Sequence, residues 1–217
     1  MELNILAVET SSAVCSLALL RTRNTNKMEI YTHESIAAQK YTECLLPMAN
    51  GLLDSLKLSP TELTALAFGQ GPGSFTGLRV ACGTAQGVAF ALGIPAIPVP
   101  STKAVIATLN RRRHDLVFVA LDARMDEVYM AVYKNVKGSH LESWKTVKEP
   151  FLISALDVTP WMEYSLLVWL PKHLEDAGSI TLAGNAWENY PDVISIKPNW
   201  QLLNKKHPTA MGVAWVA

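Results

Sequence analysis

The sequence predicts an α/β protein made of two similar lobes. The chain has 217 residues, of which 49% are hydrophobic and 18% are charged, and this is enough apolar material for one large core or two small ones. Short apolar strands alternate with helical segments in both halves. In each half an apolar strand also ends on an acid before a tight turn, at Leu6–Ser11 and at Val119–Arg124. We therefore expect two duplicated βββαβα lobes, residues 1–100 and 101–217, although any two α/β halves share part of this pattern.

In the first half we expect three strands, a helix, a strand, a second helix and a last strand. The first two strands are apolar runs separated by small polar residues, which is typical of a hairpin. Pro47 must lie in the first turns of the first helix or kink it. Ser74 is suited to cap the second helix, and Gly93 and Pro95 to end it. The expected segments are Leu3–Val8, Ala13–Leu20, Met28–Ile36, Tyr41–Leu56, Leu63–Phe68, Phe75–Leu92 and Ala96–Val99.

The second half is expected to begin with a helix and then to repeat the strand order. Its first strand runs into Asp122, and the next segment is its hairpin partner. Pro160 is expected to break the long helix. The expected segments are Ala104–Asn110, Leu116–Leu121, Glu127–Tyr133, His140–Lys148, Ile153–Leu167 and Ser179–Ala183, followed by a helical tail from Pro208.

Composition excludes several classes of protein. Lys and Arg number 19 and Asp and Glu number 19, so a broad basic surface for nucleic acid is not expected. Three cysteines without a C-x-x-C pair indicate reduced core thiols rather than disulfides or a zinc ribbon. The start of the chain lacks a basic signal-peptide region, and we expect a cytoplasmic protein. The basic run 111–114 is either a solvated loop or a contact for tRNA.

A glycine-rich segment, Gly69–Arg79, joins a strand to a helix. Free backbone N–H groups and the helix dipole favour an anion at such a junction. No Gly-Lys-Ser/Thr follows, so the segment is not a Walker A loop. A dinucleotide site is also disfavoured, because Pro72 has no backbone N–H and no acidic residue that could bind a ribose occurs between Gly77 and Lys103. An anion site and a glycine-rich turn without a ligand remain equally good interpretations.

The acids that end the two apolar strands, Glu9 and Asp122, could face a shared cleft and hold hydrated Mg²⁺ near phosphates. A phosphate-binding hairpin needs glycine in its turn, and neither turn has one, so we expect any nucleotide site to be degraded. The candidate residues of this residual nucleotide or anion cleft are Glu9, Thr10, Ser11, Gly71, Gly73, Ser74, Phe75, Thr76, Arg79, Asp122, Arg124, Gly184 and Asn185.

The two helices of the first half each have an unusual surface. The first has a wider apolar arc than one buried face requires, and the second has a row of small side chains. Small residues recur every four positions from Gly73 to Ala89, which lets another helix approach closely. The predicted partner-binding residues are Tyr41, Leu45, Leu46, Met48, Leu52, Leu53, Gly77, Ala81, Ala85 and Ala89. The alternative is that both features serve packing within the chain, which is the more common case.

The segment Gly71–Arg79, with Val8–Ser11 before it and Leu121–Arg124 after it, resembles the TsaB (YeaZ) family. The resemblance implies a two-lobed fold of the actin, hexokinase and Hsp70 type. It also implies a role in threonylcarbamoyladenosine modification at adenosine 37 of ANN-decoding tRNAs, as a partner of the paralogous transferase TsaD. The ATPase TsaE would join the assembly, and tRNA would be bound through the complex. In that family the helices matching Tyr41–Leu56 and Phe75–Leu92 form a bundle with those of TsaD, or with a second copy in a homodimer.

The resemblance also implies that this chain is not an enzyme. TsaD has a histidine pair for its metal in the register of Pro100–Val105, where this sequence has no histidine. We therefore expect no catalytic residue, no metal and no required cofactor, with weak ATP or ADP binding at a degraded site left open. The alternatives are an ATP-dependent kinase or ATPase that uses Glu9 and Asp122, and an M22-type peptidase.

Overall fold

The computed structural model describes residues 2–22, 27–36, 40–109, 116–135, 144–168, 180–204 and 207–217. These residues form two compact units, unit 1 from Met1–Thr108 with Pro208–Ala217 and unit 2 from Leu109–His207. The strands are β1 (Leu3–Glu9), β2 (Val14–Thr22), β3 (Met28–Ile36), β4 (Ala65–Gly69), β5 (Ala96–Val99), β6 (Leu116–Arg124), β7 (Glu127–Asn135), β8 (Trp144–Ser154), β9 (Ile180–Ala183) and β10 (Trp200–Leu202). The helices are α1 (Tyr41–Ser55), α2 (Phe75–Leu92), α3 (Ser101–Ala107), α4 (Ala155–Val168), α6 (Ala186–Asn189) and α7 (Ala210–Val216), with a 3₁₀ turn at Pro60–Glu62.

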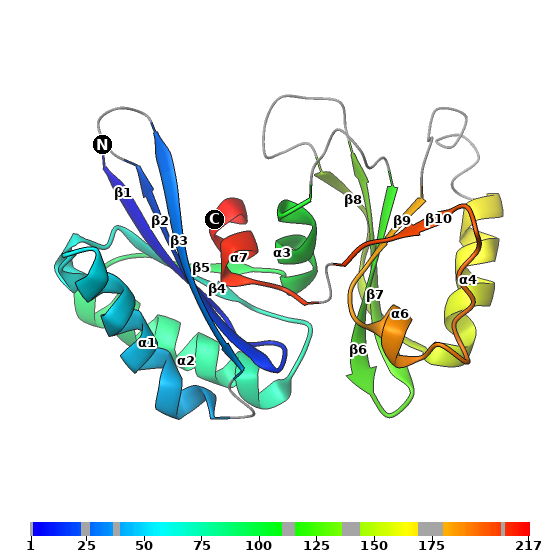
Figure 1. The fold of residues 1–217 in the computed structure, drawn as a ribbon, viewed down its shortest axis with the longest axis horizontal. Helices are drawn as coiled ribbons and strands as arrows, with labels where there is room; N and C mark the ends of the chain where they lie inside the picture. The colour runs from blue at the N-terminus through cyan, green and yellow to red at the C-terminus, as the bar shows by residue number, and fades with distance from the viewer. Residues whose placement is uncertain are drawn as a thin grey trace. The chain divides into compact units, whose positions relative to one another are not determined.

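Unit 1 is a five-stranded sheet, in the order β3-β2-β1-β4-β5, covered by helices on both faces (Figure 1). Successive residues of β1 point to opposite faces, so Leu6 and Val8 join the core under α1 and α2 while Ile5 and Ala7 join the core under α3 and α7. The central strands β1 and β4 are parallel and largely apolar because both of their faces are covered, and the polar residues of β1 are Asn4 and Glu9.

Unit 2 repeats this sheet with the order β8-β7-β6-β9-β10 when it is read from its antiparallel edge. β6 is antiparallel to β7 and parallel to β9, as β1 is to β2 and β4. One face packs against α4 and α6, where Phe118 and Met130 meet Val158, Met162 and Trp187 in one core. This correspondence confirms the predicted duplication and the two-lobed α/β fold class.

The predicted lobe boundary at residue 100 is wrong. α3 and the C-terminal helix α7 both belong to unit 1, where Ala104 and Val213 share a core with β1, β2 and β4. The close approach of α7 to α3 also depends on Gly212, because a Cβ there would overlap the carbonyl oxygen of Ala104. The chain therefore returns to its first unit after completing the second.

Local signals located most elements well. Phe75–Leu92 and Ala96–Val99 match their predicted bounds, and Gly93 ends α2 in the left-handed conformation at φ 66°. Ser74 caps α2 by accepting a hydrogen bond from the Gly77 N–H at 3.4 Å. Pro160 lies inside a continuous α4 rather than breaking it, so that prediction is wrong. The strand predicted at His140–Lys148 is observed as β8, Trp144–Ser154, and its first residues lie outside the described part of the chain.

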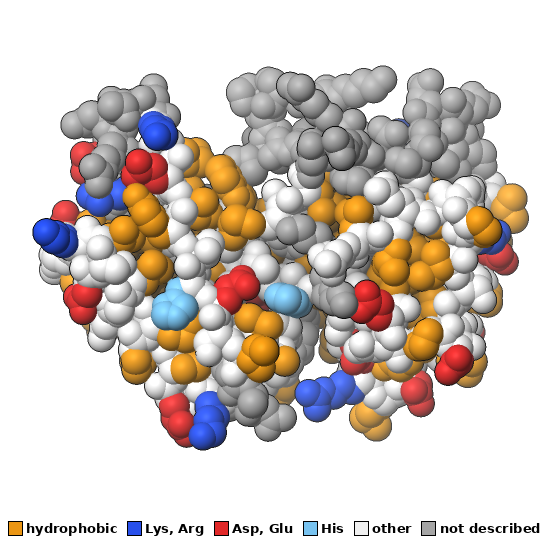
Figure 2. All heavy atoms as spheres, in the orientation of Figure 1, with side chains coloured by type: hydrophobic (Ala, Val, Ile, Leu, Met, Phe, Trp, Pro, Cys, Tyr) orange, Lys and Arg blue, Asp and Glu red, His pale blue; other side chains and the backbone are white. Residues whose placement is uncertain are grey.

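No helix among the described residues is long and apolar enough to cross a membrane. On the face shown in Figure 2, the coloured charged side chains are scattered and do not gather into a basic patch. The predicted basic run 111–114 lies outside the described residues.

Candidate functional site

Helix α2 carries two parallel stripes of residues, and the predicted docking stripe is the one that faces inward. Gly77 fits against the β1–β2 hairpin, since a Cβ there would overlap the carbonyl oxygen of Thr10. Ala81 and Ala85 have no exposed surface and pack in the unit 1 core. Small residues thus let α2 approach its own sheet closely, and they are not a free docking surface.

The same correction applies to most of the residues predicted on α1. That helix lies with α2 on one face of the sheet, so its leucines complete the unit 1 core. Leu46 is the exception, with 51% of its surface exposed. The residues predicted for partner binding but buried in the chain's own core are Tyr41, Leu45, Met48, Leu52, Leu53, Gly77, Ala81, Ala85 and Ala89.

The outward stripe of α2 consists of Phe75, Arg79, Gly83 and Gly87, which also recur every four residues. A Cβ added at Gly83 or Gly87 would meet nothing within 4 Å. A glycine inside a helix costs about 1 kcal/mol relative to alanine, and packing within this chain gives no reason for either of them. Phe75 is 68% exposed, and Phe90, two turns beyond Gly83, is 91% exposed. The sequence signal for this stripe is the same four-residue spacing that marks the alanine stripe.

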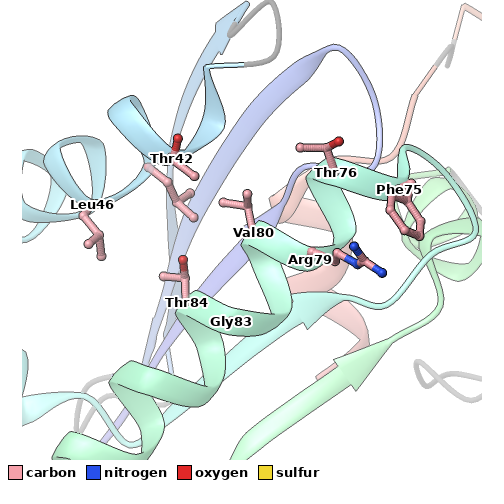
Figure 3. Close-up of a pocket in the computed structure, with 9 residues that line it drawn as sticks. Thr42, Leu46, Phe75, Thr76, Arg79, Val80, Gly83 and Thr84 are labelled. Atoms are coloured by element: carbon pink, nitrogen blue, oxygen red, sulfur yellow. The ribbon is translucent and has the colours of Figure 1, made fainter.

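A groove of about 490 Å³ lies between α1 and the outward stripe. Figure 3 shows Thr42 and Leu46 of α1 facing Val80 and Thr84 of α2 across it. Leu45 also lines the groove, although its side chain is almost fully buried. We define the α1–α2 surface as this groove together with the outward stripe and Phe90. It is an exposed, largely uncharged helical surface of the kind that marks a partner site.

The acid of the first hairpin, Glu9, is fully buried and holds the glycine-rich loop in place. Its Oε1 accepts a hydrogen bond from the Ser11 N–H at 2.7 Å, and its Oε2 accepts one from the Ser101 hydroxyl at 2.9 Å. Ser101 in turn accepts from the Gly71 N–H at 3.2 Å. Gly69 leaves room for the carboxyl group, because a Cβ there would overlap it. The prediction that Glu9 lines an open cleft is therefore wrong, and Ser101 is a partner that the sequence did not reveal.

Burial raises the pKa of Glu9 above its ordinary value of 4.5, although hydrogen bonds from Ser11, Ser101 and Thr10 oppose this. A carboxyl group with a raised folded-state pKa contributes stability that is complete below the unfolded pKa and is lost as the pH rises through the folded pKa.

Replacing Glu9 by glutamine should therefore remove one pH dependence of stability. The amide is always neutral and keeps an acceptor for the Ser11 N–H. Relative to Glu9→Gln, the wild-type protein should lose stability as the pH rises above about 4.5. Thermal unfolding of both proteins between pH 4 and pH 8 measures this, and a difference in midpoint that stays constant with pH would contradict it.

The acid of the second hairpin, Asp122, has the equivalent role in unit 2. Its Oδ1 accepts a hydrogen bond from the Arg124 N–H at 2.8 Å, two residues on, as Glu9 accepts from Ser11. It also accepts from the Tyr190 hydroxyl at 2.7 Å and from the Asn189 side chain at 2.9 Å. Burial would raise the pKa of Asp122, but the hydrogen bonds and the charge of Arg124 outweigh it and the pKa is lowered. Burial and Asp122 raise the pKa of Tyr190 to about 12.

The predicted cleft residues fall into two groups, one in each unit. In unit 1, the Thr10 hydroxyl donates to the carbonyl of Gly77, and the Ser11 carbonyl accepts from the Ser74 N–H. In unit 2, Asn185 accepts from the Asp122 N–H at 3.0 Å, and Gly184 fits closely against the carbonyl of Ala120. The polar groups expected to hold phosphates are thus largely engaged in closing the two hairpins.

Gly73 lies against Ser11, whose backbone carbonyl a Cβ there would overlap. The groove is lined by three further candidates of the predicted cleft, Phe75, Thr76 and Arg79. Among the described residues, no group of three or more His, Cys, Asp or Glu is placed to hold a metal ion. Cys15 is a free thiol whose pKa is raised to about 12 by burial and by the neighbouring Cys44.

Comparison with known proteins gives consistent matches. The family model described as TsaD, tRNA N6-adenosine threonylcarbamoyltransferase, matches residues 29–146. The tRNA threonylcarbamoyladenosine biosynthesis protein TsaB of Escherichia coli (strain K12) is 31% identical over 195 residues, which cover 88% of this chain and 75% of that protein. TsaB of Haemophilus influenzae is 41% identical over 131 residues, covering 59% of this chain and 53% of that protein. The structure described as YeaZ from Pseudomonas aeruginosa superposes with a TM-score of 0.78 at 28% identity, covering 99% of this chain and 90% of that one. The chain therefore belongs to the TsaB (YeaZ) family.

Proposed function

We propose that this protein is a non-catalytic subunit of the machinery that makes threonylcarbamoyladenosine in tRNA, and that it binds TsaD through the α1–α2 surface. The relatives named TsaB support the process, because their names assign them to threonylcarbamoyladenosine biosynthesis. The observation that carries the binding surface is the pair Gly83 and Gly87 in the middle of α2, where an added Cβ would meet nothing within 4 Å.

The physical case for a helix as the partner rests on close approach. Two glycines one turn apart remove side chains from one line along α2, so that another helix can bring its backbone and side chains into dense contact there. Leu46, Phe75 and Phe90 flank this line and offer apolar area that association would remove from water. In the family, this surface corresponds to the bundle with TsaD that the sequence resemblance implies.

The non-catalytic role is supported by how the two hairpin acids are used. Glu9 accepts hydrogen bonds from Ser11 and Ser101, and Asp122 accepts them from Arg124, Asn189 and Tyr190. Both acids therefore act as internal acceptors that hold turns. Reactivity in the complex then belongs to TsaD, and TsaE and tRNA join through the assembly. In the absence of TsaD, the same surface would pair two copies of this chain.

Molar mass by size-exclusion chromatography with light scattering tests this proposal. The purified protein mixed with its cognate TsaD should elute as a complex containing both chains, and TsaD should displace any homodimer. The protein alone should not hydrolyse ATP above a buffer control. Separate elution of the two proteins over the micromolar range, or ATP hydrolysis that Asp122→Asn abolishes, would overturn the proposal.

A further inference from the structure

The α1–α2 surface carries one charge on the α2 side, the guanidinium of Arg79. It is the only charged residue of α2. Among the described residues, the ion pairs are Lys40–Glu43 and Lys197–Glu163, so no carboxylate there lies within 4.0 Å of Arg79. The groove is lined by apolar, glycine and threonine residues apart from this cation. An exposed cation at the edge of a neutral docking surface favours a partner that places a negatively charged group at that point.

Arg79 is held in a defined position. Its guanidinium carbon lies 3.7 Å from the centre of the Phe75 ring, and Figure 3 shows the two side chains side by side at the edge of α2. Stacking uses the flat face of the guanidinium and leaves the in-plane N–H donors for another group. A carboxylate can accept two of these donors at once, which gives both direction and specificity. The nearby N-terminus of α2 adds partial positive charge, so an anion is favoured there twice over.

The order of residues along the stripe determines where on the partner helix the negatively charged group must lie. Arg79 lies one turn before Gly83 and two turns before Gly87 on the same line of the helix. A helix laid along the glycines therefore passes Arg79 at one end. We propose that the partner helix presents an Asp or Glu carboxylate to Arg79, and that this ion pair on the Phe75 ring determines which partner binds and in which register. This inference rests on the proposed function, because it names the chemistry of TsaD at the same surface.

The expected size of the effect follows from charge pairs at protein interfaces. Reversing one charge of a close interfacial pair removes the attraction and places two like charges together, and a tenfold loss of affinity corresponds to about 1.4 kcal/mol. Arg79→Glu should therefore weaken TsaD binding by at least about tenfold at low salt and should flatten its salt dependence. Arg79→Lys should lose less affinity than Arg79→Glu, because lysine keeps the positive charge but lacks the paired guanidinium N–H donors and the flat face that stacks on Phe75.

The test is a titration of TsaD against the wild type, Arg79→Glu, Arg79→Lys and Lys148→Glu at two salt concentrations. Lys148 is a matched control, an exposed cation 5.2 Å from the Phe151 ring in unit 2, and its reversal should leave affinity unchanged. Reversing acids of the TsaD helices one at a time to lysine should identify one that restores binding to Arg79→Glu.

Two results separate this inference from the proposed function. If a bulky residue at Gly83 prevents binding while Arg79→Glu binds like the wild type, the ion pair is wrong and the docking surface stands. If Arg79→Glu is weakened but no reversed acid of TsaD restores it, the proposed carboxylate is also wrong. If the wild-type protein does not bind TsaD, the proposed function and the inference fail together.

Discussion

Replacing Gly83 by tryptophan is expected to lower the affinity for TsaD by at least about 100-fold, equivalent to about 2.7 kcal/mol. The residue lines the groove between α1 and α2, and a side chain there would occupy space that the partner helix needs. The isolated protein should keep its fold, because a Cβ at Gly83 meets nothing within 4 Å and the indole can extend into solvent. Titration calorimetry measures the affinity, and circular dichroism checks the fold.

Leu156→Trp is the matched control for this result. Leu156 is 70% exposed on α4 of unit 2, so the substitution adds the same side chain away from the α1–α2 surface. It should leave TsaD binding within about threefold of the wild type, a difference below 1 kcal/mol. A folded Gly83→Trp protein that binds as tightly as Leu156→Trp would show that TsaD docks elsewhere.

Replacing Gly77 by alanine, on the inward stripe of the same helix, is expected to destabilise the protein by about 3 kcal/mol or more. The added methyl group would overlap the backbone carbonyl oxygen of Thr10, which cannot move aside as a flexible side chain could. α2 would have to shift from the β1–β2 hairpin, at the expense of the 2.7 Å hydrogen bond from the Thr10 hydroxyl to the Gly77 carbonyl. For a chain of this size the unfolding midpoint should fall by about 6–12 °C.

Gly83→Ala is the matched control on the outward stripe of α2, where the same methyl group meets nothing. It should stabilise the isolated protein by about 0.5–1 kcal/mol, because alanine is the better helix former. Chemical denaturation of the two variants measures the difference. Shifts of the same sign would mean that the assignment of inward and outward stripes is incorrect.

The sequence predicted those features of the fold that depend on local signals. α2 and its caps follow from Ser74 and Gly93, and the paired hairpins follow from apolar runs that end on Glu9 and Asp122. The orientation of α2 could not be predicted in this way. Apart from Arg79 in the first turns, both of its stripes are built from small or apolar residues, so periodicity identifies two faces and gives little to tell which one meets the sheet.

The role of the hairpin acids could not be predicted from local sequence for a related reason. An acid after an apolar strand is compatible with an open cleft and with a buried turn, and burial depends on residues far away in the sequence. For Glu9 those residues are Gly69, which makes room for the carboxyl group, and Ser101, which donates to it. The return of α7 to unit 1 is likewise non-local, because Gly212 and Val213 meet α3 across more than a hundred residues of chain.

Hydroxyl-radical footprinting with and without TsaD tests the central claim, that the α1–α2 surface is where TsaD binds. In the free protein, Leu46, Phe75 and Phe90 are 51%, 68% and 91% exposed, while Tyr164 and Leu167 of α4 are 61% and 75% exposed, so all five should be oxidised. Addition of TsaD should protect Leu46, Phe75 and Phe90 and leave Tyr164 and Leu167 unchanged. Protection of the α4 residues, with Leu46, Phe75 and Phe90 still oxidised at their free rates, would contradict it.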